Sequence, residues 1–288
     1  MPNTSHSVSR HIKHRRLSIP TFIYGTAWKE LQTEALARLA IDSGFRGIDT
    51  ANQRRHYYEA GVGEAVRKVL GERKLKRSDL FLQSKFTYAA GQDHRLPYDQ
   101  GANYASQVRQ SLESSLNHLG TSYLDAYFLH GPASGRGLTK ADWEVWRTME
   151  ALKKSGSVKS IGISNIGIDQ LRLLIEKSEV TPAFVQNRCF AKAGWDVEIR
   201  RLCRANNIIY QGFSLLTANS AELNRREIHE VARRVGYSIS QVVFRFAQQV
   251  GMIPLTGTTS IVHMKEDQAV YDFELTEAEV DTIENIAV

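Results

Sequence analysis

The chain has 288 residues, a hydrophobic content of 42% and a formal net charge of +6 at pH 7. This length and apolar content suit one barrel-sized domain, and no apolar run approaches the roughly 18 residues of a membrane helix. Cys189 and Cys203 cannot build a disulfide framework and the N-terminus lacks the apolar stretch of a secretory signal, so we expect a cytoplasmic protein that binds no membrane.

The densest basic run covers residues 10–16. One short run without interleaved aromatic side chains is a weak signal for nucleic acid, so we expect no nucleic-acid partner. We interpret residues 1–16 as an N-terminal extension of flexible chain and residues 17–288 as a single domain. A transit peptide over residues 1–17 is the alternative, because this segment is rich in Ser and Arg and has no acidic residue.

Short apolar runs alternate with helical patterns, which favours parallel βα units. The predicted strands cover residues 20–24, 46–49, 81–85, 125–130, 158–163, 183–187, 208–212 and 251–254. Eight strands that alternate with helices predict an α/β fold of the (β/α)8 TIM barrel type. A doubly wound open sheet is the alternative, but it usually carries a Gly-rich phosphate loop after its first strand, and residues 24–28 contain none.

Local signals mark where helices begin and end. Val108, Leu112, Leu116 and Leu119 recur at helical spacing, and Gly120 predicts the end of that helix. Capping boxes are predicted at Thr139-x-x-Asp142 and Thr276-x-x-Glu279, and a further helix is predicted to begin at Ser238-x-x-Gln241. Residues 222–250 hold two helical patterns in succession, so we expect one added helix outside the eightfold plan.

Titratable side chains end three of the predicted strands: Asp49, Lys85 and His130. A β/α barrel carries its chemistry at these carboxyl ends. Reduction of a carbonyl by hydride needs an acid that protonates the oxygen, and a free tyrosine, with a pKa of about 10, is too weak unless an ammonium lies nearby. Tyrosines follow Asp49, so the set suggests a proton-relay site for carbonyl reduction, without a metal.

Three segments carry a resemblance to a known family. Residues 44–51, 123–132 and 158–165 are similar to the signature segments of the aldo-keto reductases, and the resemblance runs from about residue 17 to the end. It implies a (β/α)8 barrel that binds NAD(P)H without a Rossmann domain. It also implies an enzyme that reduces a small-molecule carbonyl substrate, and a monomer.

The resemblance leaves the tyrosine's register open. In the family the catalytic tyrosine follows the aspartate by five residues, but here Arg54 stands five residues after Asp49. Anchoring on Glu59 and Val62-Gly63 puts His56 in the tyrosine's place, whereas a slip of one residue brings Tyr57 there and a slip of two brings Tyr58. We predict Tyr57 as the general acid, with Tyr58 as the alternative.

The family's roles then fall on Asp49, Tyr57, Lys85 and His130. Lys85 is expected to lower the pKa of Tyr57, Asp49 to anchor the lysine, and His130 to orient the substrate oxygen. Trp28, Tyr57 and His130 are expected to contact the substrate, and the loop over residues 86–102 to shape its pocket. The alternatives are a cofactor-binding regulatory subunit of low turnover, and a barrel lyase or isomerase that uses the same groups.

The resemblance also implies the cofactor-binding residues, which are Ser164, Asn165, Gln186, Phe213, Ser214, Leu216, Thr256, Thr258, Thr259, His263 and Asp267. The first three would hold the nicotinamide amide, and Phe213 would stack on the ring. Many relatives have a lysine where Leu255 stands, and it binds the 2′-phosphate of NADP. The resemblance implies NADP(H) rather than NAD(H). Because Leu255 carries no charge, we expect the preference for NADP(H) to be modest.

Overall fold

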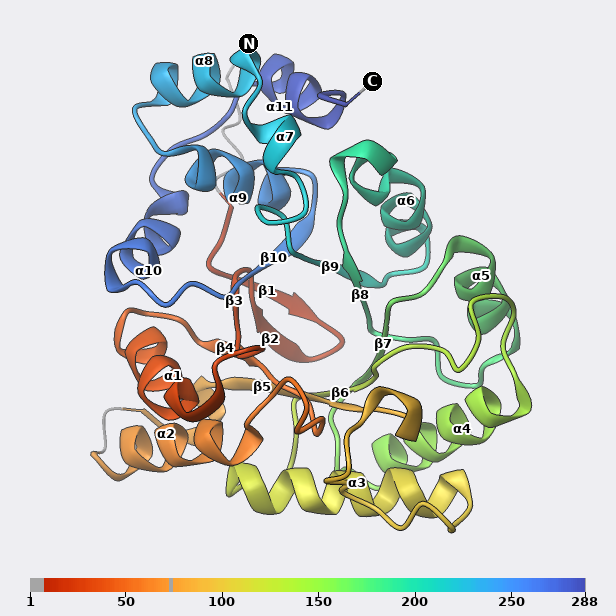
Figure 1. The fold of residues 1–288 in the computed structure, drawn as a ribbon. Helices are drawn as coiled ribbons and strands as arrows, with labels where there is room; N and C mark the ends of the chain where they lie inside the picture. The colour runs from red at the N-terminus through yellow and green to blue at the C-terminus, as the bar shows by residue number, and fades with distance from the viewer. Residues whose placement is uncertain (1–7, 73–74, 288) are drawn as a thin grey trace.

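Eight parallel strands close into a barrel in the computed structural model, which describes residues 8–72 and 75–287 (Figure 1). The strands are β3 (Ile23–Gly25), β4 (Gly47–Asp49), β5 (Phe81–Phe86), β6 (Ala126–Leu129), β7 (Ile161–Ser164), β8 (Phe184–Arg188), β9 (Ile209–Phe213) and β10 (Met252–Thr256). They pair in chain order, and β10 closes the ring against β3. The predicted barrel is confirmed, and all eight predicted strands overlap an observed one.

Helices surround the barrel (Figure 1). They are α1 (Thr33–Asp42), α2 (Glu59–Gly71), α3 (Tyr104–Leu119), α4 (Lys140–Lys154), α5 (Ile168–Lys177), α6 (Val197–Ala205), α7 (Ser220–Leu223), α8 (Arg226–Val235), α9 (Ile239–Gln249), α10 (Ile261–Gln268) and α11 (Glu277–Glu284). The segment between β9 and β10 contains α7, α8 and α9, so the expected added helix is present, together with the short α7. Within the described residues, no helix is long and apolar enough to cross a membrane.

The predicted helix signals act as expected. Thr139 and Asp142 form a reciprocal capping box at the start of α4, and the equivalent pairs begin α9 and α11. At the C-terminal end of α3, Gly120 adopts the left-handed conformation with φ of 62°, which glycine reaches at little cost. Local sequence thus determines where these helices begin and end.

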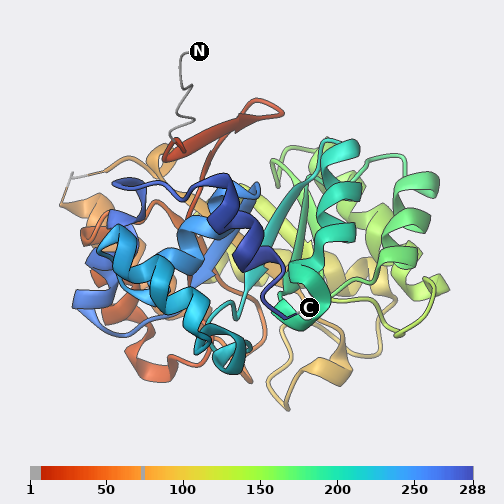
Figure 2. The same ribbon diagram turned by 90° about the horizontal axis from the view of Figure 1, so that it is seen from above.

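An antiparallel hairpin lies across the barrel on one side (Figure 2). It consists of β1 (His11–His14) and β2 (Leu17–Pro20), with Ile12 opposite Ile19. Ile19 is fully buried in a cluster with residues from the amino ends of the barrel strands, such as Phe81 and Phe184. The hairpin therefore closes the amino end of the barrel and leaves the carboxyl end for the loops.

The N-terminal residues differ in detail from two expectations. Within the expected extension over residues 1–16, residues 11–14 form a strand of this hairpin, and Ile12 packs against the buried cluster; residues 1–7 lie outside the described residues. The predicted strand 20–24 combines the end of β2 with the start of β3. The chain bends between them at residues 21–22, so the first barrel strand begins at Ile23.

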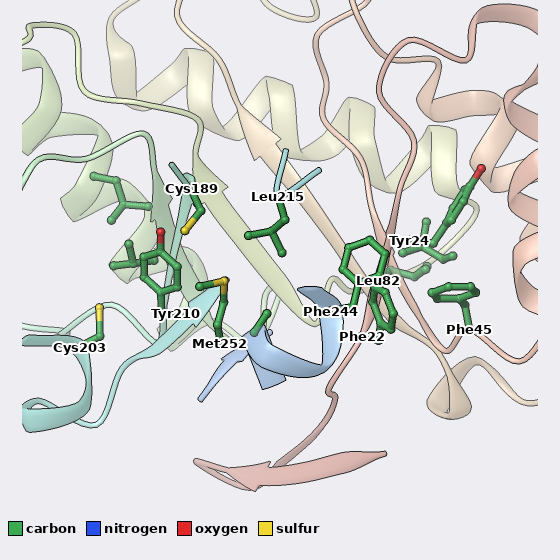
Figure 3. Close-up of a cluster of buried hydrophobic side chains, with 14 of the residues drawn as sticks. Phe22, Tyr24, Phe45, Leu82, Cys189, Cys203, Tyr210, Leu215, Phe244 and Met252 are labelled. Carbon is green, nitrogen blue, oxygen red and sulfur yellow. The ribbon is translucent and has the colours of Figure 1, made fainter. Parts of the chain in front are cut away.

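A second apolar cluster packs the helices against the outside of the barrel (Figure 3). Phe22 meets Phe45 edge-on with ring centroids 5.5 Å apart, and it lies 4.8 Å from Phe244 of α9. Tyr24 belongs to the same cluster, and its hydroxyl donates to the Thr258 carbonyl at 2.9 Å. The core thereby positions the segment after β10, where the cofactor's phosphates were expected.

Candidate active site

Three strands bring titratable side chains to the carboxyl end of the barrel. Asp49 is the last residue of β4, Lys85 precedes the last residue of β5, and His130 directly follows β6. Parallel pairing sets Asp49 opposite Gln83 and Lys85 opposite Phe128. Because all eight strands point the same way, the three side chains meet at one face of the barrel.

Lys85 and Asp49 form a buried ion pair. The Lys85 Nζ donates to Asp49 Oδ1 at 2.5 Å and to the Thr50 carbonyl oxygen at 2.9 Å. Lys85 is fully buried and Asp49 is nearly so. Burial lowers the pKa of Lys85, and the Asp49 carboxylate opposes this shift. Each partner holds the other in place, since removing one would leave a buried charge uncompensated.

Three buried glutamines orient the carboxylate of this pair from below. Gln83 and Gln186 donate from Nε2 to Asp49 Oδ1 at 2.6 and 3.0 Å. Both also donate to Gln211 Oε1, and Gln211 donates back to Gln83. With Lys85, Asp49 Oδ1 accepts three hydrogen bonds. The polar cluster therefore holds the carboxylate in one orientation inside an otherwise apolar barrel.

The loop after β4 places Tyr57 beside the ion pair. The centroid of the Tyr57 ring lies 5.4 Å from Lys85 Nζ and 6.0 Å from the centroid of the His130 ring. Tyr58 packs elsewhere, with its ring 4.5 Å from the Arg54 guanidinium, and it is not part of the cavity wall. Tyr57, the tyrosine that the sequence analysis predicted, is therefore the one beside Lys85 and His130, and its alternative Tyr58 is not.

His56, the third possibility, stands at the mouth of the same site. Its ring lies 4.0 Å from that of Trp28, and its Nδ1 is 3.0 Å from Gln53 Oε1. Trp28 is 69% exposed, adopts a φ of 62° and lines the cavity. Both rings line the cavity, and the substrate contact expected for Trp28 stays a prediction.

The net pKa shift of Tyr57 is upward, although Lys85 was expected to lower this pKa. Burial, and then the Asp49 carboxylate, raise the pKa of Tyr57 above its ordinary value. The Lys85 ammonium is bound to Asp49, so the carboxylate offsets the stabilisation that the ammonium gives the phenolate. Tyr57 thus keeps its proton at neutral pH and can donate a hydrogen bond.

His130 is a neutral imidazole in this site. Burial, the charge of Lys85 and the charge of His56 lower its pKa to about 3. The Nδ1 atom lies 2.7 Å from Thr87 Oγ1, and the backbone carbonyl accepts from Asn165 Nδ2 at 2.8 Å. The other ring nitrogen, Nε2, has no hydrogen-bond partner within residues 8–72 and 75–287.

The long loop after β5 supports the loop that carries Tyr57. Gln53 donates to the Gly91 carbonyl at 2.6 Å, and Gln92 donates to the Asn52 carbonyl at 2.8 Å. These contacts tie the two loops into one wall. Residues 86–102 thus contribute to the pocket's shape, as the sequence suggested, both through their own side chains and through support of Tyr57.

A cavity of about 1370 Å³ opens above these side chains. The predicted residues that line it are Trp28, Asp49, Tyr57, His130, Ser164, Asn165, Gln186, Phe213, Ser214, Leu216, Thr256, Thr258 and His263. Lys85 lies beneath the wall. Thr259 is exposed and Asp267 is buried in α10, and neither of these predicted cofactor residues lines the cavity.

At one end of the cavity, the residues expected at the nicotinamide amide fit that group. Asn165 donates to the His130 carbonyl, while both amide hydrogen bonds of Gln186 run inward to Asp49 and Gln211. The Gln186 Oε1 atom has no hydrogen bond to a described residue. It is therefore available to accept from a carboxamide NH₂, with Phe213 beside it as an apolar face.

At the other end, the segment after β10 offers small residues and a cation. Lys29 donates to the Gly257 carbonyl, and both line the cavity with Thr258 and His263. Ser260 caps the start of α10 by accepting from the His263 backbone N–H. Exposed hydroxyls and a lysine near a helix start suit a phosphate, although Leu255 offers no charge.

Several residues of this site were not identified from the sequence. They are Lys29, Gln83, Thr87 and Gln211. The two glutamines stand inside apolar strands, which was a visible signal of a polar barrel interior. For Lys29 and Thr87 the sequence held no comparable signal, because each acts on a residue far along the chain.

Comparison with known proteins gives a consistent result. The profile of the aldo/keto reductase family matches residues 21–288. The uncharacterized oxidoreductase YtbE of Bacillus subtilis is 31% identical over 98% of this chain and 94% of its own length. The structure of an aldo/keto reductase from Brucella melitensis superposes with a TM-score of 0.80 at 27% identity, over 96% of this chain and 98% of that chain. The structure of an aldo-keto reductase complexed with NADPH superposes with a TM-score of 0.82 at 25% identity, over 96% of this chain and 87% of that chain.

Proposed function

The chain belongs to the aldo/keto reductase family, and from that premise we propose that it reduces an aldehyde or ketone to the alcohol, with NADPH as the preferred cofactor and Tyr57 as the proton donor. The observation that carries the proposal is one cavity whose wall includes Tyr57, His130 and the residues suited to a nicotinamide amide.

The chemistry divides between the cofactor and the protein. When bound, the reduced nicotinamide supplies a hydride to the carbonyl carbon. The Tyr57 hydroxyl transfers its proton to the carbonyl oxygen as negative charge develops on that oxygen, and the O–H bond of Tyr57 is broken. His130 orients the oxygen from the side. The Lys85 ammonium, held by Asp49, stabilises the phenolate that Tyr57 becomes until a proton returns from solvent.

Two observations support NADPH over NADH. An NADPH complex is known for a structurally similar reductase, and Lys29 brings a cation to the segment after β10. Lys29 would partly replace the lysine that many relatives have at the position of Leu255. The absence of that lysine keeps the expected preference modest.

The proposal is tested by following reduced-nicotinamide absorbance with a panel of aldehydes and ketones and with each cofactor. We expect carbonyl-dependent oxidation of NADPH, and slower oxidation of NADH at equal concentration. Tight NADPH binding without turnover on any carbonyl would contradict the proposal and favour the regulatory-subunit alternative.

A further inference from the structure

Thr87 and His130 form a close contact between two neighbouring strands. Thr87 directly follows β5 and His130 directly follows β6. The Thr87 Oγ1 atom lies 2.7 Å from His130 Nδ1, and both residues line the cavity. Thr87 is itself held in place, because its backbone carbonyl accepts from the Tyr98 hydroxyl at 2.7 Å. The contact between Thr87 and His130 is therefore part of a cavity wall that hydrogen bonds hold in place.

The direction of this hydrogen bond follows from the number of hydrogens available. His130 is neutral, so it carries one N–H, on Nδ1 or on Nε2. If Nδ1 carried it, the ring would donate to Thr87, and the threonine's own hydroxyl hydrogen would need another acceptor. Within the described chain, Thr87 Oγ1 has no hydrogen-bond partner besides His130.

The opposite arrangement satisfies both groups. If Thr87 donates to Nδ1, the hydroxyl hydrogen is used and the imidazole hydrogen lies on Nε2. That nitrogen bonds to no described residue, so its hydrogen is available to a ligand in the cavity. A buried hydroxyl that uses its donor is favoured over one that leaves it unpaired, typically by about 1–3 kcal/mol.

We propose that Thr87 is a positioning residue: it donates its hydroxyl hydrogen to His130 Nδ1 and so keeps the imidazole proton on Nε2, where it hydrogen-bonds to the substrate's carbonyl oxygen. The inference rests on the proposed carbonyl reduction. In the opposite tautomer, the lone pair of Nε2 would face the lone pairs of the carbonyl oxygen and repel them. Thr87 thereby decides whether His130 attracts the substrate oxygen or repels it.

The protein without added ligand tests the tautomer directly. Histidines labelled with ¹⁵N report by NMR which ring nitrogen carries the hydrogen, and the His130 signal is identified as the one lost in His130→Gln. We expect the Nε2–H form in the natural protein and in Thr87→Ser, and loss of this preference in Thr87→Val. An Nδ1–H tautomer in the natural protein, or an unchanged tautomer in Thr87→Val, would overturn the proposal. This readout needs no turnover, so it stands even if the proposed reaction fails.

Kinetics provide the second readout. Thr87→Val should lower kcat/KM for a carbonyl substrate by about tenfold or more, since a hydrogen bond in the transition state weakens, with cofactor dissociation constants unchanged. Thr87→Ser should restore most of the rate. Thr148→Val is the matched control: Thr148 is equally buried and its hydroxyl donates to the Glu144 carbonyl in α4 at 2.8 Å, outside the cavity. An equal loss of rate in both valine variants would reduce Thr87 to a structural role.

Discussion

Tyr57 illustrates how burial alters a single side chain's chemistry. Its phenol is desolvated and lies near the Asp49 carboxylate, and both effects favour the protonated form. The Lys85 charge is already matched by Asp49. In the proposed reaction, Tyr57 is therefore a neutral donor at the start, and the Lys85 ammonium stabilises the phenolate as it forms.

The choice between the two adjacent tyrosines gives the first prediction. Tyr57→Phe removes the proton donor and should lower kcat by roughly 10²–10⁴-fold, while cofactor affinity stays near normal. Tyr58→Phe, which removes a hydroxyl from the ring beside Arg54, is the control and should be mild. Steady-state kinetics and cofactor titration of both variants check this. The reverse pattern would mean that Tyr58 is the acid.

Asp267 is a second residue whose surroundings favour the protonated form of its side chain. It is 2% exposed, and its Oδ2 atom is buried without a hydrogen-bond partner among the described residues. Burial raises the pKa of Asp267 to about 7, although a hydrogen bond from Thr256 opposes this shift. In the unfolded chain an aspartate has a pKa of about 3.9. The folded state therefore binds more protons than the unfolded state between these pH values.

This difference predicts a pH-dependent gain from Asp267→Asn. Because the folded protein holds the extra proton, stability falls as pH rises from about 4 to about 7, and an uncharged asparagine avoids that loss. The variant should be more stable than the natural protein at pH 8, on the order of 1–4 kcal/mol, and nearly equal to it at pH 4. Urea unfolding at both pH values measures this, with the exposed Asp272→Asn as control. A gain that did not depend on pH would exclude the titration as its cause.

At the scale of elements, the hairpin that closes the barrel and the cavity that holds the proposed active site lie at opposite ends of the strands. The β1–β2 hairpin buries Ile19 against the amino ends of the strands, while the cavity lies at their carboxyl ends. Loops at the carboxyl end can therefore vary without disturbing the closure. The hairpin should affect stability and leave the reaction unchanged.

Ile19→Ala tests that separation. Truncation leaves a cavity in a fully buried cluster and should lower the free energy of unfolding by about 2–5 kcal/mol. Turnover per folded molecule should remain that of the natural protein. Val262→Ala, at a side chain that is 59% exposed in α10, is the control and should be within about 0.5 kcal/mol of it. A large loss of kcat in folded Ile19→Ala would show that the two ends are coupled.

Across the whole molecule, the cavity joins loops from most of the barrel. Residues at the ends of β4, β5 and β6 carry the proposed catalytic groups, and the segments after β3 and β10 carry the proposed phosphate site. Lys29 bridges those two segments through the Gly257 carbonyl. In the proposed function, cofactor preference therefore depends on both segments, and we expect a charge at the position of Leu255 to change it.

Leu255→Lys should strengthen NADPH binding. A new ammonium beside the 2′-phosphate adds a charge-assisted hydrogen bond, of order 1–3 kcal/mol, and NADH lacks that phosphate. Leu255→Met, of similar size and without charge, is the control. Tryptophan fluorescence quenching gives both dissociation constants. An equal gain for NADH would place the new charge at the diphosphate instead.

The sequence by itself determined the strands, four of the helix boundaries and three of the proposed catalytic residues. Apolar runs and capping boxes are local patterns, and Asp49, Lys85 and His130 stand at strand ends, which a barrel gathers at one face. The resemblance to the family added the cofactor residues, of which most line the cavity.

Only the tertiary structure decided the rest. The path of the loop after β4 depends on contacts with the loop after β5, so it could separate Tyr57 from Tyr58 when spacing could not. The pKa of Tyr57 depends on burial and on which partner the Lys85 ammonium binds. The pairing of Thr87 with His130 joins residues from two strands. Each of these features depends on contacts between parts of the chain that lie far apart in sequence. Such contacts form only once the barrel has closed.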